Sequence, residues 1–526
     1  MPETDSASVA SAEGHTWPPR FFDSVDGEHD LPITEITGTL PPDLTGTLYR
    51  NGSGRWQIGS SQVNSIFDVD GMISAFILDG RGVHFRNRFV RTDHYRTTTA
   101  AGAMVQRGVT QQRPGGPLAN IGRLPANTAN TSVMLEPDSL LALHEGGRPH
   151  RMDLDTLDTL GMCSLGGALQ GPAGAFSAHY THDPVHNTSV NFGFDPYYPR
   201  IDPRRIRGAR TPQERRRRLK ELAGEAIPRI KLRMYETDNR TGRTRYLRSV
   251  PLPGQTSFPI VHDMALTARY GIFCVAPYRI RPAKFLLGAR SMWDSLKLFD
   301  GEPTYLVLAP RNGDKLRIVE TDPFFSWHYT NAFDDGDDVV VELSRWSLET
   351  LPGLHRFGID TRLGIDTLYD GLSPAQQRDA GRVTRLRISA SGRVTEEVAA
   401  DLPADFPQFD QRRSTQRHDI SYVTVQRSGE SSGTGIARID HRSGTTQQYR
   451  PPHNILLEPT FVPRSRTSAE DDGWVLTLGY DAAEHRSRLM IFDAAHLDAG
   501  PIAEAWLPFH LPMSYHGAFT SRVAAH

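Results

Sequence analysis

Two histidines lie three residues apart in the segment FSAHYTHDP, and imidazole nitrogens are common ligands of transition metals. His179 and His182 stand just before an Asp-Pro turn. Taken alone, the segment leaves open a metal-binding pair, one ligand with a bystander, or two surface histidines. On a β-strand, side chains three residues apart point to opposite faces, which argues against one metal shared by both rings.

Three further histidines lie in apolar surroundings. His262 occurs in FPIVHDMALT, His328 in FFSWHYTNAF and His516 in LPMSYHGAF. The flanking aromatic and aliphatic residues predict that all three are buried. A buried histidine is more often a hydrogen-bonded core residue than a ligand, so the local sequence leaves both interpretations open. Because these histidines are far apart in the chain, a shared metal would require distant strands to converge.

Three acidic residues could support such ligands. Glu145 in LLALHEGG and Glu458 in LLEPTFVPR follow apolar runs, and Asp405 occurs in ADFPQFD. A charged side chain is costly to bury unless it is paired. A ligating imidazole usually donates its second N–H to a carboxylate or a carbonyl group. The alternative for each acid is an exposed charge at the end of a strand.

The elements that must position these residues are short strands. Apolar runs such as GMISAFILDGRGVHFRNRFV and GWVLTLGYD alternate with period two and end at turn residues. Many short strands without alternating long helices predict an all-β sandwich, barrel or propeller. No strict repeat occurs, so periodicity alone does not select the propeller, although a repeat architecture could hold all 526 residues in one unit.

Several stretches depart from this pattern. In TPQERRRRLKELAGEAI, Thr211 is a candidate N-cap with Pro212 in the first turn, which predicts a helix. This basic helix is either a solvated surface helix or a contact for anionic lipid. The segment RIRPAKFLLGARSMWDSLKLF is either a buried helix or a hydrophobic entrance that dips into a membrane. We expect a flexible tail over residues 1–20 and one domain over 21–526, with insertions at about 96–125, 196–230 and 280–300.

Composition excludes some classes of function. The formal net charge is −2, so overall charge gives no sign of nucleic-acid binding. Cys163 and Cys274 form no CxxC site and fit a reducing, cytoplasmic location. No apolar stretch reaches the roughly 18 residues of a transmembrane helix, and no secretory signal is evident. Peripheral membrane contact stays open, and the oligomeric state is not indicated.

Eleven fragments in a fixed order resemble the carotenoid cleavage oxygenases, a family that includes apocarotenoid- and stilbene-cleaving enzymes. Among them are GTLYRNGSG, FDVDGMISAF, SAHYTHDP, VHDMALT, WHYTNAF, DFPQFD, EPTFVPR and LPFHLPMSYHG. The resemblance implies a seven-bladed β-propeller in which loops and short helices form a dome over Fe(2+). It implies the metal ligands His179, His262, His328 and His516, and the supporting acids Glu145, Asp405 and Glu458.

Two positions matter for the site that the resemblance implies. Asp405 stands where the family has a glutamate, so we expect its shorter side chain to reach an imidazole through a water or by a small strand shift. Thr131 matches a position that narrows the open coordination site of the iron.

The implied reaction adds both atoms of O2 across one C=C bond of a conjugated apolar substrate and gives two carbonyl products. A carotenoid or apocarotenoid is the favoured substrate. A stilbene is the alternative, although His144 replaces the lysine that stilbene-cleaving relatives carry; a cationic or hydrogen-bonding His could substitute. Isomerisation or hydrolysis on the same iron, or a non-catalytic propeller scaffold, are further alternatives. No organic cofactor is expected, since the substrate supplies the electrons. The sequence contains neither a GxGxxG nucleotide-binding loop nor a serine nucleophile elbow.

Overall fold

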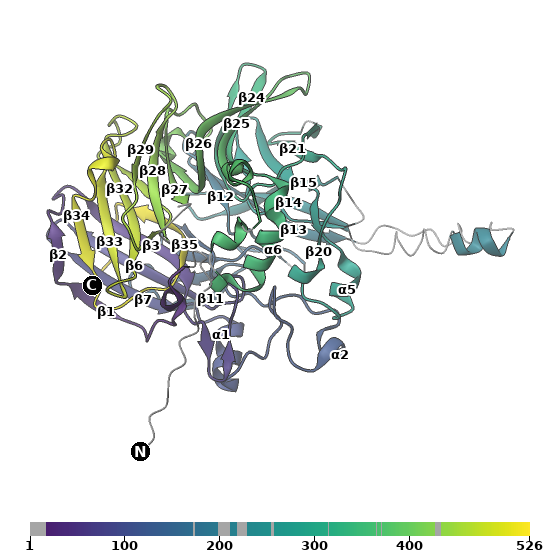
Figure 1. The fold of residues 1–526 in the computed structure, drawn as a ribbon, viewed down its shortest axis with the longest axis horizontal. Helices are drawn as coiled ribbons and strands as arrows, with labels where there is room; N and C mark the ends of the chain where they lie inside the picture. Colours follow the sequence, from purple (N-terminus) through teal and green to yellow (C-terminus); the bar gives the residue numbers. More distant parts are fainter. Residues whose placement is uncertain are drawn as a thin grey trace.

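The protein folds into a β-propeller (Figure 1). The structure is a computed structural model that describes residues 17–171, 174–197, 211–217, 229–253, 257–313, 315–363, 365–369, 371–426 and 433–526. The largest sheet has 13 strands and divides at two places: β26 (Val394–Phe409) pairs first with β25 (Ala380–Ile388) and then with β27 (Ile420–Gln426), and β30 (Asn454–Leu456) joins β28 (Thr434–Asp440) to β32 (Gly473–Asp481). On these two divisions the described strands form seven consecutive antiparallel groups, as expected of a seven-bladed propeller.

The first four blades contain these strands, in order of pairing. Blade one has β35 (Ser514–Thr520), β3 (Thr45–Ser53), β6 (Gly71–Asp79), β7 (Val83–Phe89) and β1 (Asp30–Ile33). Blade two has β8 (Ser132–Leu135), β9 (Leu140–Leu143), β10 (His150–Met152) and β11 (Thr159–Met162). Blade three has β12 (Tyr180–Asp183), β13 (Thr188–Tyr197), β14 (Arg229–Asp238) and β15 (Thr244–Pro251). Blade four has β17 (Ala265–Leu266), β18 (Tyr270–Val275), β21 (Thr304–Pro310) and β22 (Arg317–Thr321).

The other three blades complete the ring. Blade five has β23 (Tyr329–Asp335), β24 (Asp338–Trp346), β25 (Ala380–Ile388) and the first part of β26 (Val394–Phe409). Blade six has the end of β26, β27 (Ile420–Gln426), β28 (Thr434–Asp440) and β29 (Thr445–Tyr449). Blade seven has β31 (Thr460–Pro463), β32 (Gly473–Asp481), β33 (Arg486–Asp493), β34 (Ala503–Trp506) and β2 (Glu35–Gly38). A further strand, β30 (Asn454–Leu456), pairs with both β28 and β32.

Strands from both ends of the chain close the ring. The C-terminal strand β35 pairs with β3, from Thr47 opposite Thr520 to Gly52 opposite Ser514. The N-terminal strand β2 pairs with β34 in the last blade. Each end of the chain therefore completes a blade begun by the other end, and these strand pairings hold the first and last blades in a closed ring.

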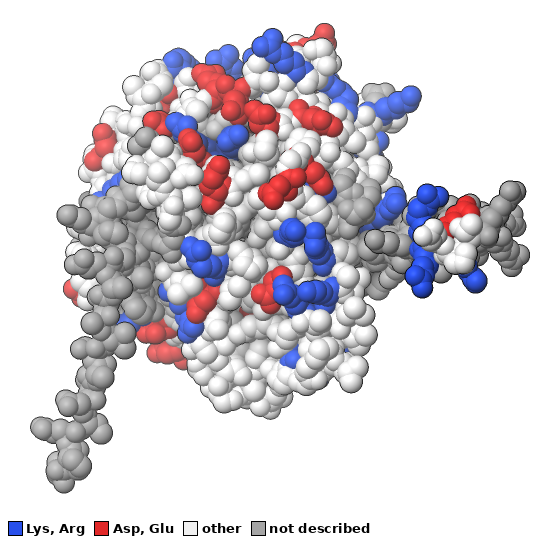
Figure 2. Space-filling view, turned by 45° about the vertical axis from the view of Figure 1, so that its right-hand side comes forward, with Lys and Arg blue, Asp and Glu red and all other residues white. Residues whose placement is uncertain are grey.

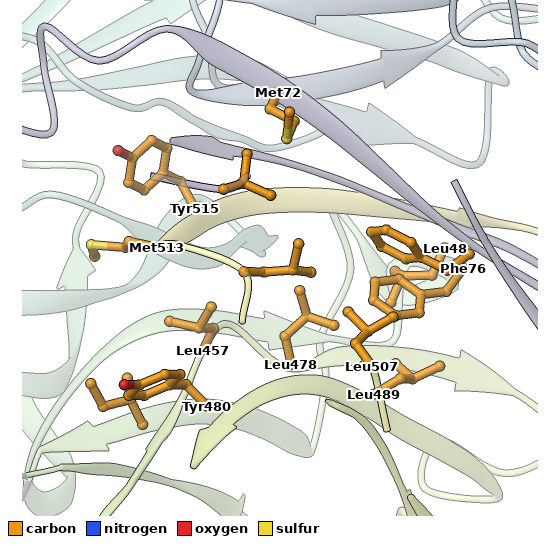
Figure 3. Close-up of a cluster of buried hydrophobic side chains, with 14 of the residues drawn as sticks. Leu48, Met72, Phe76, Leu457, Leu478, Tyr480, Leu489, Leu507, Met513 and Tyr515 are labelled. Atoms are coloured by element: carbon orange, nitrogen blue, oxygen red, sulfur yellow. The ribbon is translucent and has the colours of Figure 1, made fainter. Parts of the chain in front are cut away.

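The core lies between adjacent blades, and the alternation of each strand sorts its side chains between two neighbours. In β6, Phe76 and Leu78 pack in a cluster with Leu478 and Leu489 of blade seven (Figure 3). The residues between them, such as Ile77, pack instead with residues of blade two. Successive side chains of a strand point to opposite faces of its sheet. Because neighbouring blades cover both faces, the side chains on each face are apolar.

Short helices and loops form the dome over one end of the propeller, among them α5 (Pro282–Leu286), η2 (Trp293–Ser295), α6 (Leu351–Ile359) and η5 (Ile365–Leu368). The other helices with assigned bounds in the described residues are η1 (Pro19–Phe22), α1 (Asp93–Ala101), α2 (Gly116–Asn120), η3 (Leu348–Thr350), η4 (Thr361–Leu363), α7 (Pro374–Arg378), η6 (Gln411–Arg413) and η7 (Leu497–Ala499). Small strands also lie outside the blades: β4 (Gln57–Ile58), β5 (Ser61–Gln62), β16 (Phe258–Pro259), β19 (Tyr278–Ile280) and β20 (Leu296–Leu298).

The structure refines the expected boundaries. Trp17 is 2% exposed and packs in the core cluster of Figure 3, so the expected tail over residues 1–20 extends too far; residues 1–16 lie outside the described part. The N-cap prediction at Thr211 is confirmed, because its hydroxyl accepts the Glu214 backbone N–H. Most of the expected insertion 196–230 lies outside the described residues. The segment around 280–300 contains both a buried Phe285 and an exposed Leu287.

Gly193 in β13 provides a test of the packing between strands. A Cβ at this position would overlap the backbone carbonyl of Ala175, and a backbone atom cannot move aside as the end of a flexible side chain can. We expect Gly193→Ala to lower the free energy of unfolding by about 1–3 kcal/mol, measured by urea denaturation. Gly82→Ala is the control, since a Cβ there meets no atom within 4 Å. Equal midpoints for the two variants would contradict this account.

Candidate metal centre

Four histidines converge where inner strands meet the propeller axis. His179 and His328 immediately precede β12 and β23, His262 lies just before β17, and His516 lies in β35. One ligand atom from each lies within 4.8 Å of the others. Each side chain is at most 9% exposed. The structure thus brings together the four histidines expected from the sequence, from blades one, three, four and five.

The ring nitrogens that face each other are suited to a cation. His262 Nε2 lies 3.2 Å from His328 Nε2. His179 Nε2 is buried and has no hydrogen-bond partner among the described residues. Burial and the neighbouring imidazoles hold the pKa of His179 well below its usual value, so its nitrogen lone pair is free to coordinate. An unpartnered buried nitrogen beside three other imidazoles fits a transition-metal site.

A carboxylate from a different blade contacts the outer Nδ1 of three of these rings. His328 Nδ1 lies 2.7 Å from Asp405 Oδ1, and His516 Nδ1 lies 2.8 Å from Glu458 Oε1. Glu145 Oε1 lies against His262 Nδ1. These acids come from blades six, seven and two, the blades that supply no histidine. An Nδ1–H donated to a carboxylate fixes the ring and leaves Nε2 for the metal.

The fourth histidine has a more distant acid, Asp263, which the sequence argument missed. Asp263 Oδ1 lies 3.8 Å from His179 Nδ1. The same carboxylate accepts the backbone N–H groups of Met264 and Tyr329, at 2.6 and 2.9 Å. Burial raises the pKa of Asp263 to about 6. Its position directly after His262 in VHDM was the available signal.

Asp405 reaches its imidazole directly, despite being one methylene shorter than glutamate. The strand that carries it is irregular, with a register shift between Asp405 and Gln408 and a positive φ of 51° at Phe406. The contact with His328 is direct, at 2.7 Å, and it is made from an irregular part of β26. Burial acts to lower the pKa of His328, but Asp405 and other nearby carboxylates outweigh it and raise that pKa.

A buried arginine completes the support for Glu458. The Arg50 guanidinium donates to Glu458 Oε2 at 2.7 Å and to the Tyr515 carbonyl at 2.7 Å. Burial would raise the pKa of Glu458, but His516 and Arg50 hold it below its usual value. The buried charge is therefore paired, as burial requires. The same arginine, in the first blade, links Glu458 of blade seven to the backbone next to His516.

A cavity of about 350 Å³ opens beside the histidines on the dome side. Its walls are mostly aromatic and aliphatic, including Trp293, Trp327 and Phe357. Thr131 lines it close to the metal site, and its carbonyl accepts the His516 backbone N–H. His144 also lines it, and burial lowers the pKa of His144 to about 4, so its ring is neutral near pH 7.

His182 does not join the cluster. Its Nδ1 lies 3.0 Å from the side-chain nitrogen of Asn239, in the β14–β15 turn of the same blade. The two histidines of FSAHYTHDP therefore serve different surroundings, as their strand spacing predicts.

A second group of metal-ligating types occurs among the described residues, formed by Glu342, His418 and His441. Here the carboxylate already has partners. Arg385 donates to Glu342 Oε2 at 2.7 Å, and the Ser421 hydroxyl donates to Oε1 at 2.9 Å. A cation at this position would lie next to the positive charge of Arg385, and the single carboxylate of Glu342 would have to offset both charges. The group is therefore best described as a satisfied hydrogen-bond network.

Comparison with known proteins agrees with this site. The family model described as retinal pigment epithelial membrane protein matches residues 22–521. The apocarotenoid-15,15'-oxygenase of Synechocystis sp. is 32% identical, over 98% of this chain and 99% of that protein. The lignostilbene-alpha,beta-dioxygenase isozyme III of Sphingomonas paucimobilis is 26% identical, over 93% and 94%. The crystal structure of cobalt-substituted Synechocystis ACO superposes with a TM-score of 0.81 at 30% identity, covering 96% of this chain and 99% of that one.

The two histidines of the opening segment allow a matched test. His179→Ala removes one of four ligands, so we expect a near-complete loss of bound Co²⁺ after anaerobic loading, measured by mass spectrometry of the metal. His182→Ala should bind as much Co²⁺ as the unaltered protein, because its ring faces Asn239. Full binding by His179→Ala would show that the metal is held elsewhere.

Asp405→Asn tests the outer carboxylates. The amide keeps the shape but cannot stabilise the His328 Nδ1 proton as a carboxylate does, so we expect metal affinity to fall about 10–100-fold, measured by competition with a chelator. Asp401→Asn is the control in the same strand, because Asp401 pairs with Arg382 at the surface. Equal dissociation constants would remove Asp405 from the metal site.

Proposed function

This chain belongs to the family of the retinal pigment epithelial membrane protein, the carotenoid cleavage oxygenases, and we propose that it cleaves a C=C bond of a carotenoid or apocarotenoid with O2. It is an alkene-cleaving dioxygenase of the carotenoid-cleavage type. The observation that carries the proposal is the four-histidine cluster at the wall of an apolar cavity.

The residues present fit Fe²⁺. His179, His262, His328 and His516 would hold it through Nε2, with Glu145, Asp405 and Glu458 on the opposite ring nitrogens. Iron bound to four neutral imidazoles would keep an open position for activating O2 beside an alkene. The carboxylates accept the Nδ1 protons in hydrogen bonds, which would leave Nε2 of these rings to the metal. An intact set of ligands and acids argues against a non-catalytic scaffold.

The cavity supplies the rest of the site. Trp293, Trp327 and Phe357 offer flat apolar surfaces to a polyene and exclude bulk water. Thr131 narrows the space next to the ligands. Its hydroxyl donates to Asn130 Oδ1 at 3.0 Å, which fixes the side chain against that wall.

The apolar walls favour a carotenoid or apocarotenoid over a stilbene. A neutral His144 lacks the positive charge that a lysine would offer to a phenolate, and so it provides a hydrogen bond only. The stilbene alternative rests on the similarity to the lignostilbene dioxygenase.

Peripheral membrane contact is part of the proposal. Leu118, Ile121, Leu124 and Leu287 are 51–87% exposed and lie on and beside α2 and α5. These elements touch, since the Gly122 N–H donates to the Leu286 carbonyl. Leu124 also lines the cavity, so the apolar surface borders its mouth. Charged residues are sparse on the lower part of the face in Figure 2. None of the described helices is long and apolar enough to span a bilayer.

Product analysis tests the proposal. Anaerobically Fe²⁺-loaded protein is given O2 with an apocarotenal or with resveratrol, and the aldehydes are identified by mass spectrometry. We expect two carbonyl products from the apocarotenal and much slower cleavage of resveratrol. Faster cleavage of resveratrol would establish the stilbene alternative, and isomerised or hydrolysed substrate without O2 uptake would contradict the dioxygenase. His516→Ala should abolish cleavage.

A further inference from the structure

A second, smaller cavity reaches the histidine cluster from the side away from the dome. It has a volume of about 100 Å³, and we call it the axial chamber. The residues that follow the ligand histidines along the inner strands line it, whereas the residues that precede them line the large apolar cavity. Thr181 and Thr330, for example, lie in the chamber, while Val261 and Trp327 lie in the cavity.

The ring of Phe406 lies between the two spaces. Its centroid is 4.9 Å from that of His328 and 5.3 Å from that of His516, and all three residues line both cavities. The left-handed backbone at Phe406 aims this ring toward the axis. The metal site can therefore be approached from two sides that do not share a passage.

The two approaches differ in chemistry. Oxygen-bearing side chains line the axial chamber: Thr181, Asp263, Thr330, Asn331, Gln408, Gln411, Glu458, and the tyrosines Tyr180 and Tyr329. Thr330 is 6% exposed, and its hydroxyl has no hydrogen-bond partner among the described residues. Buried hydroxyls are normally satisfied, so an orphaned one that lines the chamber indicates a polar occupant that comes and goes. The carboxylate groups of Asp263 and Glu458 lie at the inner end of the chamber, beside the histidines.

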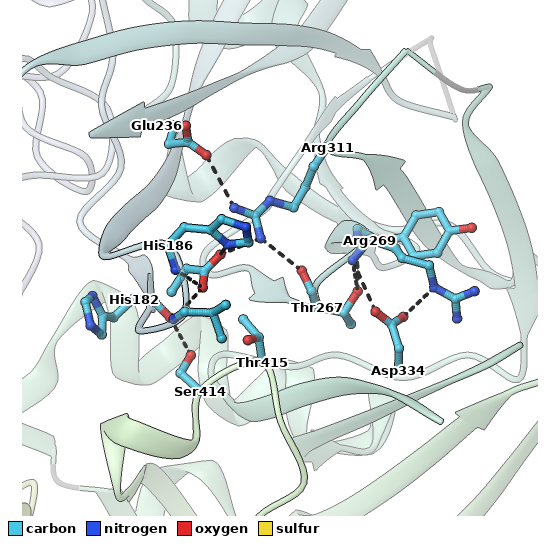
Figure 4. Close-up of polar contacts among 12 residues, drawn as sticks. His182, His186, Glu236, Thr267, Arg269, Arg311, Asp334, Ser414 and Thr415 are labelled. Carbon is cyan, nitrogen blue, oxygen red and sulfur yellow. Dashed lines mark hydrogen bonds and ion pairs between the residues drawn. The ribbon is translucent and has the colours of Figure 1, made fainter. Parts of the chain in front are cut away.

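The outer end of the axial chamber reaches the surface. Gln411, in η6, lines the chamber and is exposed to solvent. The segment after η6 is fixed beneath the blades, because the Ser414 hydroxyl donates to the His182 carbonyl, a contact drawn in Figure 4. The Thr415 backbone N–H donates to Asn331 Oδ1 at 3.1 Å. These bonds hold the chamber mouth in one shape.

We propose that the axial chamber is the route by which a hydrated divalent cation enters and leaves the folded protein. The inference rests on the proposed function in taking Fe²⁺ as that cation. Moving a strongly hydrated ion into an apolar cavity costs far more desolvation free energy than moving it along a path lined by hydroxyl, amide and carboxylate oxygens. Oxygen donors can replace its waters one at a time, and negative charge at the inner end draws it toward the imidazoles.

The test follows metal exchange and does not depend on catalysis. Folded apo-protein is mixed with Co²⁺, uptake is timed by tryptophan fluorescence, and the final content is measured by mass spectrometry of the metal. Thr330→Met fills the chamber without removing a hydrogen bond, and Gln411→Trp covers its mouth. We expect both to slow uptake and release by about tenfold, equivalent to roughly 1.4 kcal/mol on the barrier. The dissociation constant should stay unchanged, which damage to the ligands would not allow.

Two matched variants serve as controls. Gln416→Trp alters an exposed residue of the same segment that does not line the chamber, and Leu124→Trp narrows the mouth of the apolar cavity. Both should take up Co²⁺ at the normal rate. Normal rates in Thr330→Met and Gln411→Trp, slow uptake in Leu124→Trp, or uptake that requires unfolding and refolding would each overturn the proposal. If uptake follows the chamber but Fe²⁺-loaded protein cleaves no alkene, only the proposed function fails.

Discussion

The contact between three of the four imidazoles and an acid from another blade is the constraint that organises this molecule. A histidine at the start of an inner strand can rotate, and only the bond at Nδ1 directs Nε2 to the axis. His262 on blade four depends on Glu145 of blade two, and His516 on blade one depends on Glu458 of blade seven. No single blade supplies both a ligand histidine and the acid that fixes its ring. The full circle of blades is therefore required before the four nitrogens can meet, and this explains why a large propeller surrounds so small a site.

The axis also separates two environments that the reaction must keep apart. On the dome side the cavity is apolar and suits a substrate that dissolves in lipid. On the other side the chamber is lined by hydroxyl, amide and carboxylate groups. Phe406 lies between the two cavities. It belongs to the irregular part of β26 that brings Asp405 into contact with His328. One local irregularity in β26 thus both orients the ligand His328 and places the Phe406 ring between the two cavities.

Much of the fold could be predicted from the sequence. Short strands such as β6 carry apolar residues on both faces, and this pattern is visible in the sequence. The resemblance supplied the ring of blades and the histidines, which local patterns left undecided. What could not be predicted depends on contacts between distant segments. The Asp263 carboxylate accepts two backbone N–H groups, one of them from Tyr329 on the next blade. Residue spacing in the sequence does not predict such a contact. Trp17 looked like part of a polar tail, although its ring packs against Phe21 and Phe22. Those two rings in turn contact Tyr480 and Trp56, and the first of these contacts joins distant parts of the chain. The helix at Thr211, which needs only neighbouring residues, was predicted correctly.

The pairing of β35 with β3 has a consequence for the order of events during synthesis. Domains begin to fold from the N-terminus while the chain is being made. Here the first blade is completed by β35, the last of the described strands to be made, which also carries His516. The four histidines can therefore meet only after residues of all the blades have been synthesised. Assembly of the metal site follows closure of the ring and does not precede it.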